Sequence, residues 1–277
     1  MTVALHLPQL GLEVKMISKI GNDEHGQKIL EFVEGYGLDT SCIQHDEQHP
    51  TGTVQVDNTD VENIKYTIVS PAAWDFIGLR NEALKAVQAA DAFIFGSLSV
   101  RNHESWETLY HLLHEPVLKI FDINLRAPFY DFEQIEIIFG YTDILKINED
   151  ELVIVADYFD IALPEKANYL EKTNSVSTYL TEHFPISMVC VTLGAKGALI
   201  YQKGKIISHP GYKVKVEDTV GSGDAFLSGL VKSYLEGKKT EDILDFASTM
   251  GAFVATQKGG TPKYRLEDVL AVKGTEK

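Results

Sequence analysis

The chain has 277 residues, 44% of them hydrophobic and 23% charged, which is typical of a globular protein with a sizeable core. Its formal net charge of −15 argues against a nucleic-acid partner, because phosphate backbones require clustered lysine and arginine. The two cysteines, Cys42 and Cys190, lack the spacing of a disulfide framework or a zinc site, and no apolar run approaches membrane-spanning length. We therefore expect a cytoplasmic protein with reduced thiols that binds neither nucleic acid nor membrane.

Apolar runs typical of buried strands alternate along the chain with amphipathic segments typical of helices. The expected strands are 14–20, 92–95, 118–121, 143–147, 188–193 and 198–201, with a further β-rich segment at 212–217. The expected helices are 3–7, 24–36, 106–113, 133–139, 225–235 and 240–256. This alternation predicts an α/β fold in which a mostly parallel sheet lies between two helical layers.

One segment breaks this alternation. Residues 51–57 and 63–69 are rich in β-formers and flank a turn at Asn58-Thr59-Asp60, which predicts a hairpin. Because open α/β sheets bind ligands beyond their strand ends, a hairpin inserted over residues 51–70 could serve as a lid there. A purely structural edge hairpin is an equal alternative, and its free edge could pair with a second copy to form a homodimer.

The most informative segment is a glycine loop directly before an apolar helical stretch. Gly221 and Gly223 permit backbone conformations that side chains disfavour and let a ligand approach the main chain. The free N–H groups at the start of a helix and the positive end of its dipole form a cradle suited to phosphate. Asp224 in that cradle suits a base that takes a proton from the group being phosphorylated. The alternative is a plain turn followed by an acid that the helix dipole favours.

Residues 218–224 (DTVGSGD) and 228–230 (SGL) closely resemble the C-terminal signature of the ribokinase-like (PfkB) carbohydrate kinases. Further motifs follow in the order of that family, at residues 20–26, 73–75, 95–98, 121–126, 146–151, 191–198 and 257–262. The resemblance covers about residues 3–262. It implies a single ribokinase-like domain over residues 1–277, a three-layer α/β/α sandwich with a small β lid.

The resemblance implies roles for the glycine loop. Asp224 would contact the sugar and act as general base, contributing roughly 10²–10⁴ in rate. The backbone N–H groups of Gly221, Ser222 and Gly223 would stabilise the charge that develops on the transferred phosphoryl group. Asp218 would help bind a monovalent cation such as K⁺, and its structural alternative is a turn-forming acid.

Other motifs of the resemblance imply binding of ATP, Mg²⁺ and sugar. Asn148 and Glu151 would order Mg²⁺ and its waters, with Glu151 acting through water, although the same pair alone reads as a helix capping box. Arg126 would bind the sugar, and its alternative is a surface ion pair with Asp122 or Asp131. The nucleotide side would be formed by Thr192, Gly194, Gly197 and Gly259. Structural turns are the alternative for Thr192 and Gly194.

Two histidine pairs are weaker candidates for a metal site. His45 and His49 flank two acids in a loop, and His111 and His114 are three residues apart on an expected helix. Neither pair has a third ligand at suitable spacing, so packing or surface roles are favoured over metal binding.

The resemblance is incomplete at the start of the sequence. Members of the family begin with a strand that bears an acidic sugar-binding residue, then a Gly-Gly loop, whereas residues 3–7 already resemble the first helix. We expect one βα unit to be missing, with the phosphate half of the site intact and the sugar half incomplete. The expected function is an ATP-dependent, fructokinase-like sugar kinase. The alternatives are ribose, 2-keto-3-deoxygluconate or a nucleoside as substrate, or an impaired protein that only binds nucleotide or sugar.

Overall fold

The computed structural model describes residues 1–57, 65–164 and 166–274, and the chain divides into two compact units. The larger unit comprises residues 1–14, 90–98 and 116–277, and the smaller unit comprises residues 15–89 and 99–115. No helix in the described part of the chain combines the length and apolarity that crossing a membrane requires.

The larger unit is built on a six-stranded sheet with the strand order β10-β9-β8-β7-β6-β5. Its strands are β5 (Ala92–Gly96), β6 (Leu118–Asp122), β7 (Ile144–Asn148), β8 (Met188–Thr192), β9 (Ala198–Gln202) and β10 (Lys205–His209). Strands β5 to β8 run parallel, while β9 is antiparallel to both β8 and β10. The parallel strands are rich in isoleucine, valine and leucine, as expected where helices cover both faces.

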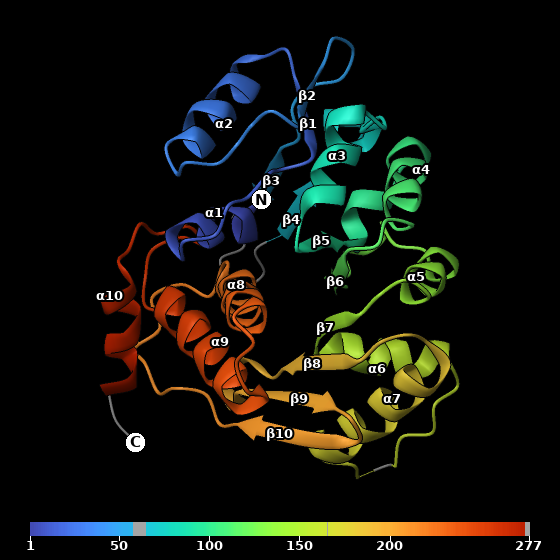
Figure 1. Ribbon diagram of the computed structural model, residues 1–277, viewed down its shortest axis with the longest axis vertical. Coiled ribbons are helices and arrows are strands. Elements are labelled where there is room, and N and C mark those ends of the chain that lie inside the picture. Colours follow the sequence, from blue (N-terminus) through green and yellow to red (C-terminus); the bar gives the residue numbers. More distant parts are fainter. Residues whose placement is uncertain (58–64, 165, 275–277) are drawn as a thin grey trace. The chain divides into compact units, whose positions relative to one another are not determined.

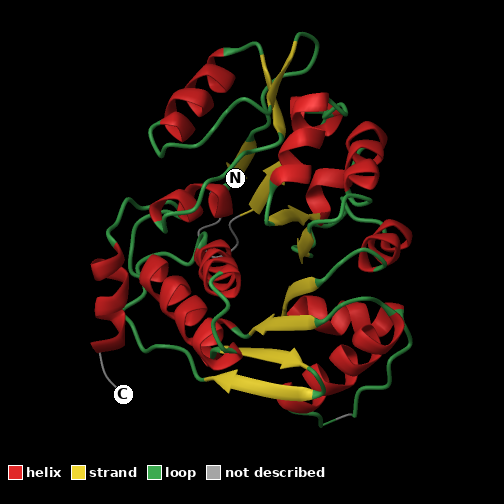
Figure 2. Ribbon diagram, viewed as in Figure 1, coloured by secondary structure: helices red, strands yellow, loops and turns green. Residues whose placement is uncertain are grey.

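Seven helices accompany this sheet in the described residues of the larger unit. They are α1 (Thr2–Gln9), α5 (Phe132–Phe139), α6 (Glu149–Tyr158), α7 (Tyr169–His183), α8 (Ser222–Leu235), α9 (Thr240–Ala255) and α10 (Leu266–Leu270), with short 3₁₀ turns η3 (Gly194–Lys196) and η4 (Ala271–Gly274). Figure 2 shows the helices in red around the yellow strands.

Successive residues of each strand face opposite sides of the sheet. On one side, Ile120, Ile144 and Met188 form a core with Leu227 and Leu230 of α8. On the other side, α6 contacts β7 and β8, and α7 contacts β8 and β9. Figure 1 shows α8 and α9 separated from α6 and α7 by the strands. The predicted α/β class, with a mostly parallel sheet between helical layers, is confirmed.

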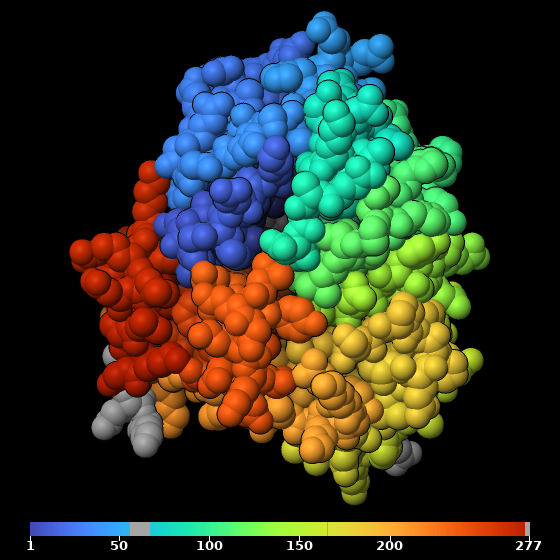
Figure 3. Space-filling view, viewed as in Figure 1, coloured from blue at the N-terminus to red at the C-terminus, as the bar shows by residue number. Residues whose placement is uncertain are grey.

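Helices α8 and α9 approach closely because a glycine lies at their contact. A Cβ built on Gly229 would lie 2.9 Å from the Cα of Ala247 and 2.9 Å from the Cγ of Met250. In Figure 3 the atoms of these two helices, in orange, form one continuous surface. This contact joins α8 to α9, and the two helices share one apolar core with the sheet.

The smaller unit contains two separate two-stranded sheets. β1 (Ser18–Gly21) pairs in parallel with β2 (Ile43–Asp46), and β3 (Val54–Asp57) pairs antiparallel with β4 (Lys65–Ile68). Its helices are α2 (Glu24–Glu34), α3 (Asn81–Ala89) and α4 (His103–Leu112), with a 3₁₀ turn η1 (Ala73–Phe76), while η2 (Ser97–Val100) spans the sequence boundary between the units. The strand pairing of the expected hairpin is thus found, and its turn at Asn58-Thr59-Asp60 lies outside the described residues.

Some sequence-based predictions were wrong. Residues 212–217 form no strand, and the N–H groups of Glu217 and Asp218 instead donate to the carbonyl of Ala255, at 2.8 and 3.3 Å. The edge strand β10 was missed because its residues are only partly buried or exposed and give no apolar run. Of the expected strand 14–20, only its end falls within β1.

The buried thiol of Cys190 gives a first testable prediction. Cys190 is fully buried in the core between the sheet and α8, and burial raises the pKa of its thiol to about 12. Because the thiolate is the nucleophile, iodoacetamide at pH 8 should leave Cys190 unmodified in the native protein and alkylate it in guanidinium. Peptide mass spectrometry measures both states, and equal labelling of Cys190 in the two would contradict the prediction.

Candidate active site

The glycine loop begins helix α8 in the way expected for an anion cradle. Gly221 is the N-cap residue with φ +78°, and its carbonyl accepts the N–H of Ala225 at 2.9 Å. Among the described residues, the N–H groups of Gly223 and Asp224 have no backbone acceptor. The buried Oγ of Ser222 likewise has no partner within the part of the chain that the structure describes. These groups are available to an anion at the positive end of the helix.

A second loop fixes the position of the first. A Cβ built on Gly221 would lie 2.5 Å from the Cα of Gly260, so the two backbones touch where a side chain would not fit. The carboxylate of Asp218 accepts the N–H of Val220 at 2.9 Å and that of Gly259 at 3.2 Å. Asp218 and Gly259, both predicted site residues, are therefore brought together with the cradle. Both oxygens of Asp218 take part in this turn, which is the structural role given as its alternative.

His6 on α1 supports the same loop and was missed in the sequence. It is fully buried, with Nε2 3.0 Å from the carbonyl oxygen of Gly260 and Nδ1 3.1 Å from the hydroxyl of Tyr264. Burial lowers the pKa of His6, against the opposing effects of the Gly260 carbonyl and the Asp224 charge. A single histidine in an apolar helix carries no sequence signal for this contact.

A buried ion pair lies beneath the cradle. Asp122 and Lys146 are register partners on neighbouring strands β6 and β7, and Lys146 Nζ donates to Asp122 Oδ1 at 2.9 Å. The two side chains are 10% and 8% exposed. A Cβ built on Gly223 would lie only 3.5 Å from Lys146 Nζ. The ammonium group therefore sits against the first turn of α8.

The two members of this pair have shifted pKa values. Burial raises the pKa of Asp122 to about 6, with the Lys146 charge opposing the shift and the charges of Asp224 and Glu151 adding to it. Burial alone would lower the pKa of Lys146, but Asp122, together with Glu151 and Asp224, outweighs burial and raises it. The charge of Lys146 is thus maintained by the carboxylates around it.

Asn148 and Glu151 form the capping box of helix α6. The Asn148 side chain accepts the N–H of Glu151 at 2.8 Å, and Glu151 Oε2 accepts the N–H of Asn148 at 2.9 Å. Glu151 Oε1 accepts the N–H of Leu125 at 2.8 Å, which ties the segment after β6 to the start of α6. Both oxygens of this buried carboxylate are engaged, so the pair fits Mg²⁺ held through water and not by a direct bond to Glu151.

The residues expected on the nucleotide side follow β8. Thr192 ends this strand and is the register partner of Asn148, so the two predicted residues lie at neighbouring strand ends. Gly194 has φ +57°, and none of the described atoms lies within 4 Å of the point that a Cβ would occupy, which leaves its surface open. The fold requires glycine at position 197, because a Cβ there would lie 1.9 Å from the carbonyl oxygen of His209.

Arg126 is exposed, and its Nη1 donates to the carbonyl of Leu125 at 2.9 Å. The surface ion pairs suggested as its alternative are not formed among the described residues. Asp122 pairs with Lys146, and Asp131 accepts the N–H of Glu133 as the N-cap of α5. The guanidinium therefore remains accessible after the end of β6.

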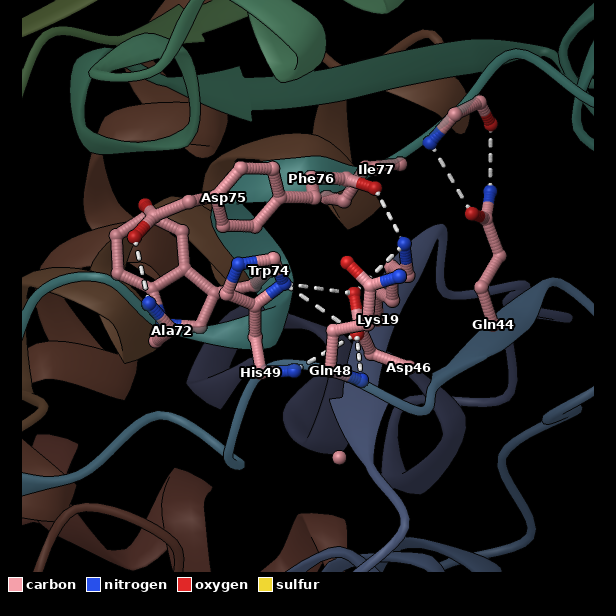
Figure 4. Close-up of polar contacts among 12 residues, drawn as sticks. Lys19, Gln44, Asp46, Gln48, His49, Ala72, Trp74, Asp75, Phe76 and Ile77 are labelled. Carbon is pink, nitrogen blue, oxygen red and sulfur yellow. Dashed lines mark hydrogen bonds and ion pairs between the residues drawn. The ribbon is translucent and has the colours of Figure 1, made fainter.

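The histidine pairs do not form metal sites in the described part of the chain, where no group of three potential ligands occurs. In the smaller unit, Figure 4 shows His49 and Lys19 both directed at the carboxylate of Asp46. Lys19 Nζ lies 2.8 Å from Asp46 Oδ2, and the His49 ring stacks on Phe76 with centroids 3.8 Å apart. This cluster fixes the turn η1 against β1 and β2.

A cavity of about 500 Å³ in the larger unit lies beside the approach to the glycine loop. It is lined by residues before that loop, by the end of α9 and by α10 and η4: Lys213, Val214, Lys215, Glu217, Phe253, Thr256, Gln257, Asp268, Ala271 and Val272. None of the predicted site residues lines it. The cradle is instead a surface formed by strand ends and a helix start, as open α/β sheets favour.

Two glycines of the loop should respond differently to alanine. Gly221→Ala places a side chain against Gly260 at positive φ and should destabilise the protein by about 1–3 kcal/mol. Gly223→Ala meets only Lys146 Nζ, at an ordinary contact distance of 3.5 Å, and should change stability by less than about 1 kcal/mol. Urea unfolding of both variants tests this contrast, and equal losses would contradict it.

Comparison with known proteins agrees with this geometry. The pattern of the family described as pfkB family carbohydrate kinase matches residues 1–265. A protein named probable fructokinase-7 from Arabidopsis thaliana is 27% identical over 285 residues, covering 94% of this chain and 78% of the relative.

Two solved structures share the fold. The fructokinase of Xylella fastidiosa with bound ATP has a TM-score of 0.85 and 20% identity, covering 99% of this chain and 88% of that one. The fructokinase of Vibrio cholerae with fructose, ADP and calcium bound has a TM-score of 0.79 and 23% identity, covering 98% and 89%.

Proposed function

The chain belongs to the pfkB family of carbohydrate kinases and is a phosphotransferase that uses ATP, and from this premise we propose that it phosphorylates a hydroxyl of a small sugar, with fructose as the first candidate. The observation that supports this most is the position of Asp224 in the first turn of α8, beside N–H groups that have no backbone acceptor among the described residues. A carboxylate and an anion cradle at one helix start provide both parts of phosphoryl transfer.

In the proposed reaction, Asp224 accepts the proton of the sugar hydroxyl as its oxygen attacks the γ-phosphorus of ATP. The bond from that phosphorus to the bridging oxygen breaks, and ADP leaves with the electron pair. The N–H groups of Gly223 and Asp224 and the hydroxyl of Ser222 stabilise the negative charge on the transferred group. Each well-placed donor of this kind is worth on the order of 3 kcal/mol of barrier.

Cations would complete the charge balance of this site. Mg²⁺, when bound, neutralises phosphate charge, and Asn148 and Glu151 would hold it through water at the end of β7. Asp218 and the backbone around Gly259 would lie close to a monovalent cation such as K⁺. Arg126, which is exposed after the end of β6, would contact the sugar, and Thr192 and Gly194 would contact the nucleotide.

The role of Asp224 is tested by Asp224→Ala. Because the base is lost while the cradle remains, kcat should fall by roughly 10²–10⁴ and Mg-ATP should still raise the Tm. ADP release with fructose, ribose, 2-keto-3-deoxygluconate and a nucleoside measures turnover and names the substrate.

The matched control is Asp242→Ala, which removes an exposed acid from the first turn of α9. This variant should leave kcat within about twofold of the unaltered chain. The substitution removes only a favourable interaction with the dipole of α9, which contributes to stability and not to the proposed reaction. Retained turnover in Asp224→Ala would refute its role as base. Nucleotide binding without turnover of any sugar by the unaltered chain would favour the alternative of a binding protein without catalysis.

A further inference from the structure

The pair Asp122–Lys146 lies at an unusual place for buried charge. Side chains alternate along each strand, so Asp122 shares a face with Ile120, and Lys146 shares that face with Ile144. That face is covered by α8. Of the register pairs of β6 and β7 on this face, the last, Asp122 with Lys146, is therefore an ion pair. The preceding pair on the same face, Ile120 with Ile144, is a packed apolar contact.

Burial of this pair is not explained by stability alone. Taking a lysine and an aspartate out of water costs more than an apolar pair of similar size would, and replacing such pairs with apolar residues often leaves stability unchanged or improved. The position of the ammonium group offers another explanation. The ammonium group of Lys146 lies against Gly223. Gly223 belongs to the turn whose N–H groups face the expected position of the phosphoryl group.

The charges around this turn are mostly negative. The carboxylates of Asp122, Glu151 and Asp224 all interact electrostatically with Lys146. Without its ammonium group, these three carboxylates would lack a cation beside the first turn of α8, where the proposed reaction brings an anionic phosphoryl group.

We propose that Lys146, held in place by Asp122, is a positioning residue for phosphoryl transfer, because its ammonium group keeps the first turn of α8 attractive to the phosphoryl group. The proposal rests on the function proposed above and deepens it. Lys146 acts through the first turn of α8, at Gly223, and no contact between Lys146 and substrate is required.

The test compares Lys146→Met with the double variant Lys146→Met/Asp122→Asn. The single variant leaves a buried carboxylate without its partner and is expected to lose stability. The double variant removes both charges and keeps similar volumes, so it should fold. If Lys146 acts on the cradle, the double variant should retain a kcat deficit of about tenfold or more.

The control for these variants is Lys19→Met, which breaks another largely buried lysine–aspartate pair, at 2.8 Å, in the smaller unit. It should lower stability without lowering kcat or the affinity for Mg-ATP. A double variant with unaltered kcat would overturn the proposal and leave the pair a structural one.

A binding measurement separates this proposal from the proposed function. Calorimetry with Mg-ATP and with adenosine needs no sugar and no turnover. We expect the double variant to bind Mg-ATP several-fold more weakly and adenosine with unchanged affinity, because only the phosphates meet the altered charge. Equal affinities for Mg-ATP in the double variant and the unaltered chain would refute the role of Lys146. Absence of turnover in the unaltered chain would refute only the proposed reaction.

Discussion

The close approach of Gly221 to Gly260 is the constraint on which the rest of the candidate site depends. No Cβ fits between these backbones. The position of the start of α8 is therefore fixed, and its N-cap residue Gly221 has a left-handed backbone conformation. Asp218 binds N–H groups of both contacting loops, and His6 contacts the carbonyl of Gly260. The N–H groups of the first turn are consequently oriented before any ligand arrives, which is the condition for electrostatic preorganisation.

Charged side chains of the sheet strands lie next to this arrangement. Asp122, Asn148 and Thr192 end β6, β7 and β8, and Lys146 lies two residues before the end of β7, where parallel strands bring distant segments to one edge. Burial alone would disfavour the charged lysine, and its neighbouring carboxylates maintain it. In the proposed function, a helix start and a buried ion pair together attract phosphate although the chain as a whole is strongly acidic.

Several parts of this structure were predictable because their signals are local. Strong apolar runs indicated β5 to β9, and the run of glycines with Asp224 indicated the start of α8. The capping box of Asn148 and Glu151 was visible in their spacing and is present. Strand β10 and the irregular path of residues 212–217 were not predictable, because pairing partners distant in sequence decide them.

The sequence by itself determined the fold class, the family and the identity of the loop that carries Asp224, because periodicity and short motifs are properties of neighbouring residues. Only the tertiary structure decided the surroundings of that loop. The register of β6 and β7 sets Lys146 opposite Asp122, and the packing of α8 on their face places the ammonium group against Gly223. Contacts of this kind join residues far apart in the chain, and no local pattern encodes a distance of that sort.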